Sequence, residues 1–155
     1  MGLERTILAV NLLLQFWKKQ GIKILPKTAN EVKVLQKNKG FELPNDFTEL
    51  YIRVNGMKTL YPNEIDAEGF LFYPIEAVIS VGNEFEGSLL ENKEKIFIFA
   101  EYMHRSWWYG FERINSEQYI IGIIPDKDTF KPITNSLAEF IELYIEDSSK
   151  LYDYS

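Results

Sequence analysis

The chain offers few side chains that could make or break a covalent bond. It has no cysteine, and its single histidine, His104, stands beside an arginine and aromatic residues in a predicted hairpin turn, where a catalytic base is unusual. Gly87-Ser88 lacks the second glycine of the pattern around a serine nucleophile. Asp126-x-Asp128 lacks the glycine and the closing glutamate of a calcium loop, and glycine patterns that bind nucleotide phosphates are absent. The sequence therefore predicts no catalytic residue, no metal site and no cofactor, and we expect that the protein is not an enzyme.

Aromatic and acidic side chains gather in the middle of the chain. Residues 96–102 and 106–114 carry large apolar groups at both alternating positions, so both faces of a sheet built from them hold aromatic side chains. Strict alternation places Ala100 and Tyr102 on the face opposite Phe99 and Glu101. Either all these groups belong to the core, or one face is an aromatic patch with an acidic rim that suits partner binding. The candidate partner-binding residues are Glu68, Glu101, Tyr102, Trp107 and Trp108.

Charge is distributed unevenly along the 155 residues. Residues 1–40 hold eight of the 17 basic and two of the 23 acidic residues, so their net charge is +6 and that of residues 41–155 is −12. An acidic body repels phosphates, which argues against direct nucleic-acid binding. It suits a basic protein partner, although an acidic surface also serves solubility alone.

Three helical segments precede the aromatic region of residues 96–114. Apolar residues at helical spacing predict a helix over residues 3–20, and we expect it to be largely covered, by the rest of the chain or by another chain. Thr28 and Glu31 form a capping box that opens a helix ending at Gly40. Residues 43–56 predict a third helix, with Pro44 at its first position and Asn55-Gly56 at its end. Its apolar stripe is expected to seed the core and consists of Phe47, Leu50, Tyr51 and Val54.

An antiparallel sheet is predicted next. Residues 70–73, 96–102, 106–114 and 119–124 read as strands, residues 82–95 as a loop, and 75–81 as either a helical turn or a loop. Ser136 and Glu139 form a second capping box before a closing helix, after which the tail from Asp147 is expected to fray. We therefore predict one α+β domain over 1–155, with a helical part at about 1–56, a sheet at about 57–130 and a C-terminal helix at about 136–147.

Several of these segments resemble the SUKH superfamily. The resemblance runs from about Thr28 to Tyr144 and rests on the capped helix with Gly40-Phe41, on Leu43-Pro44 leading to Asn55-Gly56, and on the Ser136 to Phe140 start of the last helix. Members often carry a glutamate where this chain has Leu35-Gln36. The superfamily includes the fungal Smi/Knr regulators of cell-wall synthesis and many bacterial immunity proteins. It implies an α+β fold with a central antiparallel sheet, and a binding activity.

We therefore expect a bacterial immunity protein that occludes a cognate toxin domain, of nuclease or deaminase type, through an acidic surface. The alternatives are an intracellular regulatory or scaffold protein like the fungal relatives, and a small-ligand-binding domain. Apolar runs are too short to cross a bilayer, which predicts a cytoplasmic protein without membrane contact. Met1-Gly2 to Thr6 matches a myristoylation pattern, but a Met-Gly start also arises in cloning. The sequence leaves the oligomeric state open.

Overall fold

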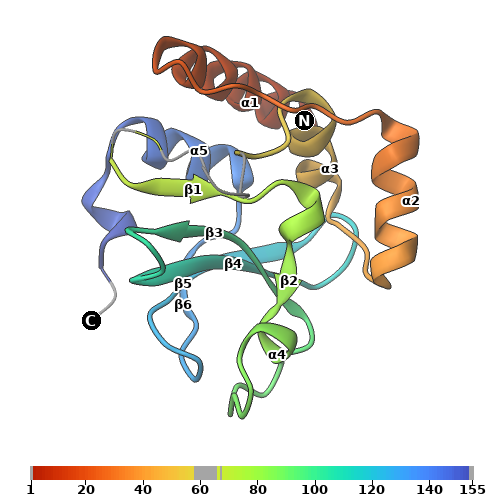
Figure 1. Cartoon of the computed structure of the whole chain (residues 1–155), viewed down its shortest axis with the longest axis vertical. Helices are drawn as coiled ribbons and strands as arrows, with labels where there is room; N and C mark the ends of the chain where they lie inside the picture. The colour runs from red at the N-terminus through yellow and green to blue at the C-terminus, as the bar shows by residue number, and fades with distance from the viewer. Residues whose placement is uncertain (1, 58–65, 67, 154–155) are drawn as a thin grey trace.

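A layer of helices lies on one face of an antiparallel sheet, as the α+β prediction requires (Figure 1). The computed structural model describes residues 2–57, 66 and 68–153. The helices are α1 (Gly2–Lys19), α2 (Ala29–Lys39), α3 (Asn45–Arg53), α4 (Val81–Glu84) and α5 (Leu137–Ile145), with 3-10 turns η1 (Ile75–Ala77) and η2 (Ser149–Leu151). The strands are β1 (Phe70–Phe72), β2 (Ile79–Ser80), β3 (Ile96–Tyr102), β4 (Trp107–Arg113), β5 (Tyr119–Ile124) and β6 (Lys131–Thr134).

Strands β3, β4 and β5 form a meander, and β6 extends it on one edge. On the other edge, β1 and β2 pair with different halves of β3. The sequence missed β6, because it is short and contains Pro132. Proline lacks the N–H that a central strand needs, but an edge strand tolerates it. The predicted loop over 82–95 is also partly wrong, since α4 begins at Val81 with the Ser80 hydroxyl accepting from the Asn83 amide.

Helix α3 anchors the core as predicted. Phe47, Leu50, Tyr51 and Val54 are all fully buried. The Phe47 ring packs on Phe111 of β4, with ring centroids 4.2 Å apart. Pro44 lies one position earlier than predicted, at the N-cap.

The Asn55-Gly56 pair that ends this helix has a larger role than stopping it. Asn55 has a φ of 64°, and its buried side chain donates to the Leu25 carbonyl at 2.9 Å and accepts from the Ile75 amide at 2.8 Å. A Cβ at Gly56 would stand 2.2 Å from the carbonyl carbon of Tyr73. The pair therefore joins three segments that are far apart in sequence.

Helix α1 is only half covered. Its inner face buries Ala9, Val10, Leu13 and Trp17 against α3, α5 and the sheet. Leu8 and Leu12 are 66% and 58% exposed, so the rest of the chain does not cover this face, and cover by another chain stays a prediction. The spacing of apolar residues could not show how much of so broad a stripe the other elements reach.

The myristoylation pattern, Met1-Gly2 to Thr6, covers the first turns of α1. Met1 lies outside the described residues. Thr6, the last position of the pattern, is buried and donates to Asp46 Oδ1 at 2.7 Å. Thr6 therefore ties the first turns of α1 to the start of α3.

The end regions of the other helices follow local signals. The Thr28–Glu31 capping box is complete, and Gly40 ends α2 in the left-handed region. At α5, the Ser136 hydroxyl accepts from the Glu139 amide. The predicted fraying from Asp147 is wrong for the described residues, which end at 153, because η2 buries Leu151. The Leu151 carbonyl accepts a hydrogen bond from the Tyr109 hydroxyl.

Candidate functional site

The turn between β3 and β4 has an unusual backbone. Met103, His104 and Arg105 are three consecutive non-glycine residues with φ of 48°, 53° and 67°. This left-handed conformation costs roughly 1–2 kcal/mol per residue. Ser106 closes the turn, its amide donating to the Tyr102 carbonyl at 2.9 Å and its hydroxyl to the Met103 carbonyl at 2.8 Å. The predicted hairpin is confirmed, and the only histidine lies exposed at its tip.

Four of the five predicted partner-binding residues flank this turn, but they divide between the two faces of the sheet. Glu101 pairs with Trp108, and Tyr102 pairs with Trp107. Residues directly opposite each other on antiparallel strands share a face. Tyr102 and Trp107 therefore lie on the face that the helices cover, and Glu101 and Trp108 on the other.

A β-bulge in β3 overturns the alternation expected for this strand. The register with β4 shifts between Ile98 and Ala100. Phe99 stays on the helix-covered face, where its ring contacts Phe47 and Phe140, and Ala100 and Tyr102 now share that face. A bulge inserts one extra residue, so every later side chain changes sides relative to strict alternation.

Tyr102 and Trp107 form a stacked pair at the edge of the core, with ring centroids 4.7 Å apart and an interplanar angle of 28°. Both side chains are half-buried. The Trp107 indole donates to the Tyr109 hydroxyl at 2.9 Å, and Tyr152 packs edge-on against Tyr102. The pair is thus part of the core on one side and part of the surface on the other.

Glu68 lies near this stacked pair. The Met103 amide donates to the Gly69 carbonyl at 2.9 Å, which holds the segment before β1 beside the turn. Burial raises the pKa of Tyr102, and the negative charges of Asp147 and Glu68 raise it further. Glu68 is exposed, so the surface beside the stacked pair is acidic.

Glu101 lies at the base of a pocket on the opposite face. It is 7% exposed; its Oε1 accepts from the Tyr73 hydroxyl at 2.9 Å and stands 3.6 Å from Arg105 Nε. Burial raises the pKa of Tyr73, and the charge of Glu101 raises it further. The pocket, called here the Glu101 pocket, measures about 370 Å³ and is lined by Leu71, Tyr73, Ala77, Ile79, Glu84, Glu101 and Arg105.

Trp108 is the neighbour of Glu101 on this face. Its half-buried ring meets Phe85 edge-on, with centroids 4.8 Å apart. Its buried indole N–H has no hydrogen-bond partner among the described residues. Trp108 therefore contributes packing on this face without a polar contact.

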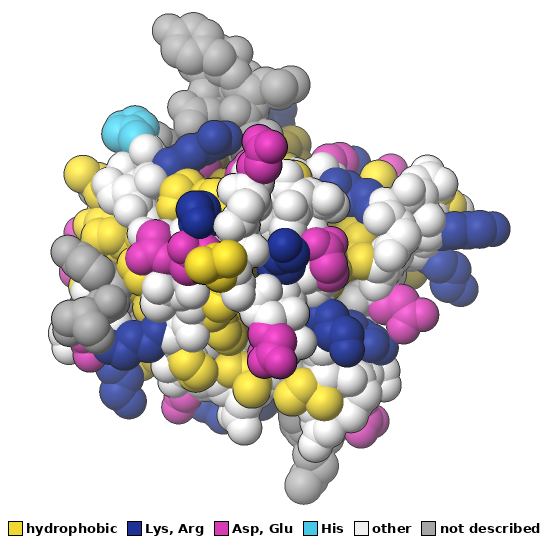
Figure 2. All heavy atoms as spheres, turned by 90° about the horizontal axis from the view of Figure 1, so that it is seen from below, with side chains coloured by type: hydrophobic (Ala, Val, Ile, Leu, Met, Phe, Trp, Pro, Cys, Tyr) yellow, Lys and Arg dark blue, Asp and Glu magenta, His cyan; other side chains and the backbone are white. Residues whose placement is uncertain are grey.

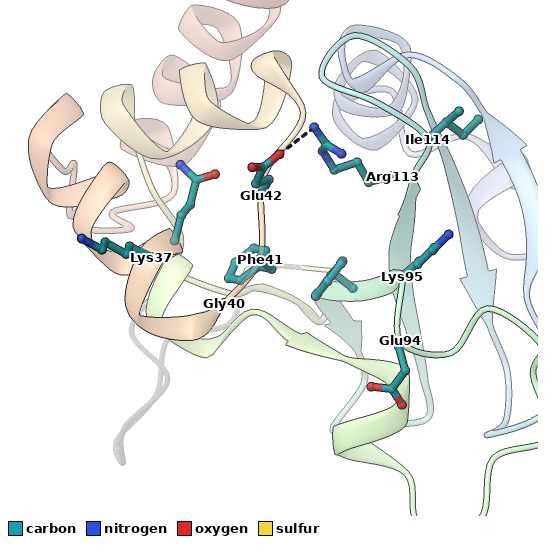
Figure 3. A pocket seen from close by; sticks show the side chains of 10 residues that line it. Lys37, Gly40, Phe41, Glu42, Glu94, Lys95, Arg113 and Ile114 are labelled. Atoms are coloured by element: carbon teal, nitrogen blue, oxygen red, sulfur yellow. Dashed lines mark ion pairs between the residues drawn. The ribbon is translucent and has the colours of Figure 1, made fainter.

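A second hollow, of about 570 Å³, lies between α2 and the end of β4 (Figure 3). Phe41 stacks on Phe97 at its base, with ring centroids 4.9 Å apart. The Glu42 carboxylate pairs with Arg113 at 3.0 Å across it, and Lys37 projects from α2 on the other side. Sequence reasoning missed this hollow, although Gly40-Phe41 was part of the motif. Its charges are of both signs, so it favours no class of ligand.

Gln36 belongs to the Leu35-Gln36 pair, at whose place the resemblance to the SUKH superfamily implies a glutamate in many members. Its side-chain Oε1 accepts from the Leu43 amide at 2.7 Å. The residue therefore holds the end of α2 to the segment that leads into α3. A glutamate would supply the same acceptor oxygen, so this departure from the motif preserves the contact.

Comparison with known families decides the identity of the fold. The model for the SMI1 / KNR4 family (SUKH-1) matches residues 26–143, more than half of the chain. The chain belongs to the SUKH-1 family. A search of curated proteins found no match. The match starts after α1, so in this SUKH-1 protein α1 packs onto the family core from outside the matched region.

Two features are absent from the described residues of this SUKH-1 protein, a cluster of metal ligands and a membrane-spanning helix. Over residues 2–57, 66 and 68–153, no group of three or more His, Asp or Glu side chains could hold a metal ion. None of the helices in that part of the chain combines the length and apolar character needed to cross a bilayer.

Figure 2 shows the molecule from below, on the side away from α1. Basic, acidic and apolar side chains alternate over this surface. On this face the carboxylates are thus interspersed with lysines and arginines and form no continuous acidic patch.

Proposed function

We propose that this SUKH-1 protein is a non-enzymatic protein-binding module, and that it acts as an immunity protein for a bacterial toxin domain of nuclease or deaminase type. It binds the toxin through the β3–β4 hairpin end and occludes the toxin's active site. The observation that carries the proposal is the set of Glu68, Tyr102 and Trp107 beside a turn of three left-handed residues.

The physical argument starts from pre-organisation. A strained turn persists only where its surroundings over-determine it, and such strain gathers at functional sites. Half-buried aromatic side chains already fixed by stacking lose little entropy when a partner covers them. Tyrosine and tryptophan are also the residues that most often dominate binding energy. The hairpin end therefore combines rigid anchors with a negative rim.

The charge of residues 41–155 supports a basic partner. Nuclease domains carry positive charge where they bind phosphates, so an acidic protein can cover that surface. Electrostatic complementarity acts mainly on the association rate. We therefore expect added salt to slow association more than it speeds dissociation.

The test is co-expression with the toxin-domain product of the neighbouring gene, followed by co-purification and binding measurements. Trp107→Ala is expected to weaken binding by about 2 kcal/mol or more, as a hot-spot residue does. Glu68→Lys should slow association, whereas Glu117→Lys, the same charge reversal in the exposed β4–β5 turn, should change it little.

Two outcomes would count against the proposal. One is that no complex forms with any neighbouring toxin domain. The other is a complex with signalling proteins in place of a toxin, which would favour the regulatory or scaffold role that is the alternative within this family.

A further inference from the structure

The Glu101 carboxylate is a buried charge with a pocket in front of it. Within the described residues, Tyr73 and Arg105 both approach it through Oε1, which leaves Oε2 without a hydrogen bond. Among the described residues, Oε2 is not a fully buried atom without a partner. It therefore retains contact with solvent, and a donor in the pocket can reach it. A buried carboxylate costs free energy unless it is paired, which makes this oxygen a strong acceptor for an incoming donor.

The pocket walls suit a long side chain with a positive end. Leu71, Ala77 and Ile79 provide apolar wall, and Glu84 adds a second carboxylate. Arginine and lysine carry an apolar stem below a charged head, so they match a pocket with apolar sides and an acidic end. An anionic ligand would meet two carboxylates against the single, mostly exposed guanidinium of Arg105. A neutral ligand would leave Glu101 Oε2 without a charged partner.

The side chain of Arg105 already forms an ion pair with Glu101. Its guanidinium stands 3.6 Å from Glu101 while its side chain is 64% exposed. That separation is longer than a charge-assisted hydrogen bond of about 2.7–2.9 Å. Because the arginine side of the pair is mostly exposed and the separation is long, the pair contributes little and is easily replaced. The left-handed turn holds Arg105 over the carboxylate without burying it.

We propose that the Glu101 pocket receives an arginine or lysine side chain of the partner protein, and that Arg105 occupies the carboxylate until the partner displaces it. This inference rests on the proposed function, because it names the chemistry by which the same partner is recognised. The incoming cation bonds to Glu101 with its stem on Leu71 and Ile79, and Arg105 turns outward. The pocket thereby adds a specific anchor to the stacked surface of Tyr102 and Trp107 on the other side of the hairpin.

The test uses N-acetyl-L-arginine methylamide as probe and its citrulline analogue as the uncharged control of equal shape. Binding to the full chain is followed by backbone amide shifts in NMR spectra. We expect the arginine probe, and not the citrulline probe, to shift the amides of Leu71, Ala77 and Ile79. Glu101→Gln should weaken binding about tenfold or more, since it removes the charge that faces the ligand.

Arg105→Gln should strengthen binding about two- to fivefold, the factor expected when an exposed ion pair no longer competes. The matched control is Arg53→Gln, because Arg53 pairs with Glu49 at the same i,i+4 spacing and neither residue lines the pocket. The affinity of this variant for the arginine probe should not change. Three results would each overturn the proposed role of the pocket. They are equal shifts with both probes, no shift with the arginine probe, and an unchanged affinity of Arg105→Gln for that probe. If Glu101→Gln does not fold, Arg105→Gln alone decides.

The same variants separate this inference from the proposed function. If the toxin complex forms equally well with Glu101→Gln, the pocket does not receive a side chain of the toxin, and the immunity role remains supported. Arginine-specific binding in a chain that captures no toxin domain supports the pocket and overturns the immunity role.

Discussion

The indole N–H of Trp17 donates a 3.0 Å hydrogen bond to the hydroxyl of Tyr144, which joins α1 to α5. The Tyr144 hydroxyl in turn donates to Oδ2 of the buried Asp66, and Asp66 Oδ1 accepts from the amides of Glu68 and Phe70. Helix α1, which lies outside the family match, is therefore connected to the segment that carries Glu68.

Trp17→Phe breaks this link while keeping an aromatic ring in the core. The Tyr144 hydroxyl loses a donor in a buried place, so we expect the free energy of unfolding to fall by about 1–3 kcal/mol. Urea denaturation followed by circular dichroism measures it. Trp108→Phe is the control, because it removes an indole N–H that has no partner among the described residues. A loss as large in Trp108→Phe as in Trp17→Phe would contradict the role of the hydrogen bond.

Leu50→Ala tests whether α3 anchors the core. Leu50 is fully buried, and removing its side chain leaves a cavity that costs about 2–5 kcal/mol of unfolding free energy. Leu89→Ala is the control, since Leu89 is 82% exposed and should change stability by about 0.5 kcal/mol or less. A Leu50→Ala loss under about 1 kcal/mol would mean that the site collapses around the smaller side chain.

Asn55→Gly separates the two roles of Asn55. Glycine adopts the left-handed φ readily, so the change removes the hydrogen bonds to Leu25 and Ile75 without adding backbone strain. Two buried backbone groups lose their partners, and we expect a loss of about 2 kcal/mol or more. Thermal unfolding provides the measurement. An unchanged melting temperature would show that Asn55 acts only through its backbone conformation.

Gln36→Glu and Gln36→Ala form a matched pair. Glutamate keeps an oxygen that can accept from the Leu43 amide, whereas alanine leaves that amide without the 2.7 Å bond seen here. Alanine should therefore cost about 1–2 kcal/mol and glutamate clearly less. Hydrogen exchange at the Leu43 amide should accelerate in Gln36→Ala alone. Equal exchange in both variants would exclude the hydrogen bond as the cause.

Stability should decrease at alkaline pH. Burial raises the pKa of Tyr51, Tyr73, Tyr109, Tyr119 and Tyr144 above the ordinary value, which is about 10. As pH rises past that value, the unfolded chain releases protons that the folded chain still holds, so the unfolded state is favoured. Urea midpoints should be constant with respect to these groups below about pH 9 and fall above about pH 10. Tyrosinate absorbance from more than the four other tyrosines before unfolding would contradict the burial.

Local signals in the sequence determined much of the helical part. The capping box at Thr28, the stop at Gly40, the apolar stripe of α3 and the positive φ of Asn55 all depend on neighbours within a few residues. Such interactions are fixed by residue type and spacing, because the groups involved meet as soon as the helix forms. The strands β3 and β5 were also predicted with their observed bounds, because β-branched and aromatic residues are concentrated there.

Only the tertiary structure decided how the candidate residues are arranged. Strict alternation puts Glu101 on the same face as Phe99, and the bulge before Ala100 places it on the opposite face. A bulge depends on pairing with another strand, which no local pattern states. Burial of Glu101 likewise needs Tyr73, 28 positions away, to supply its donor. The sequence thus identified which residues gather at the hairpin and that Tyr102 and Glu101 lie on opposite faces. Long-range packing decided which face the helices cover, with the stacked aromatic pair on that face and the acidic pocket on the other.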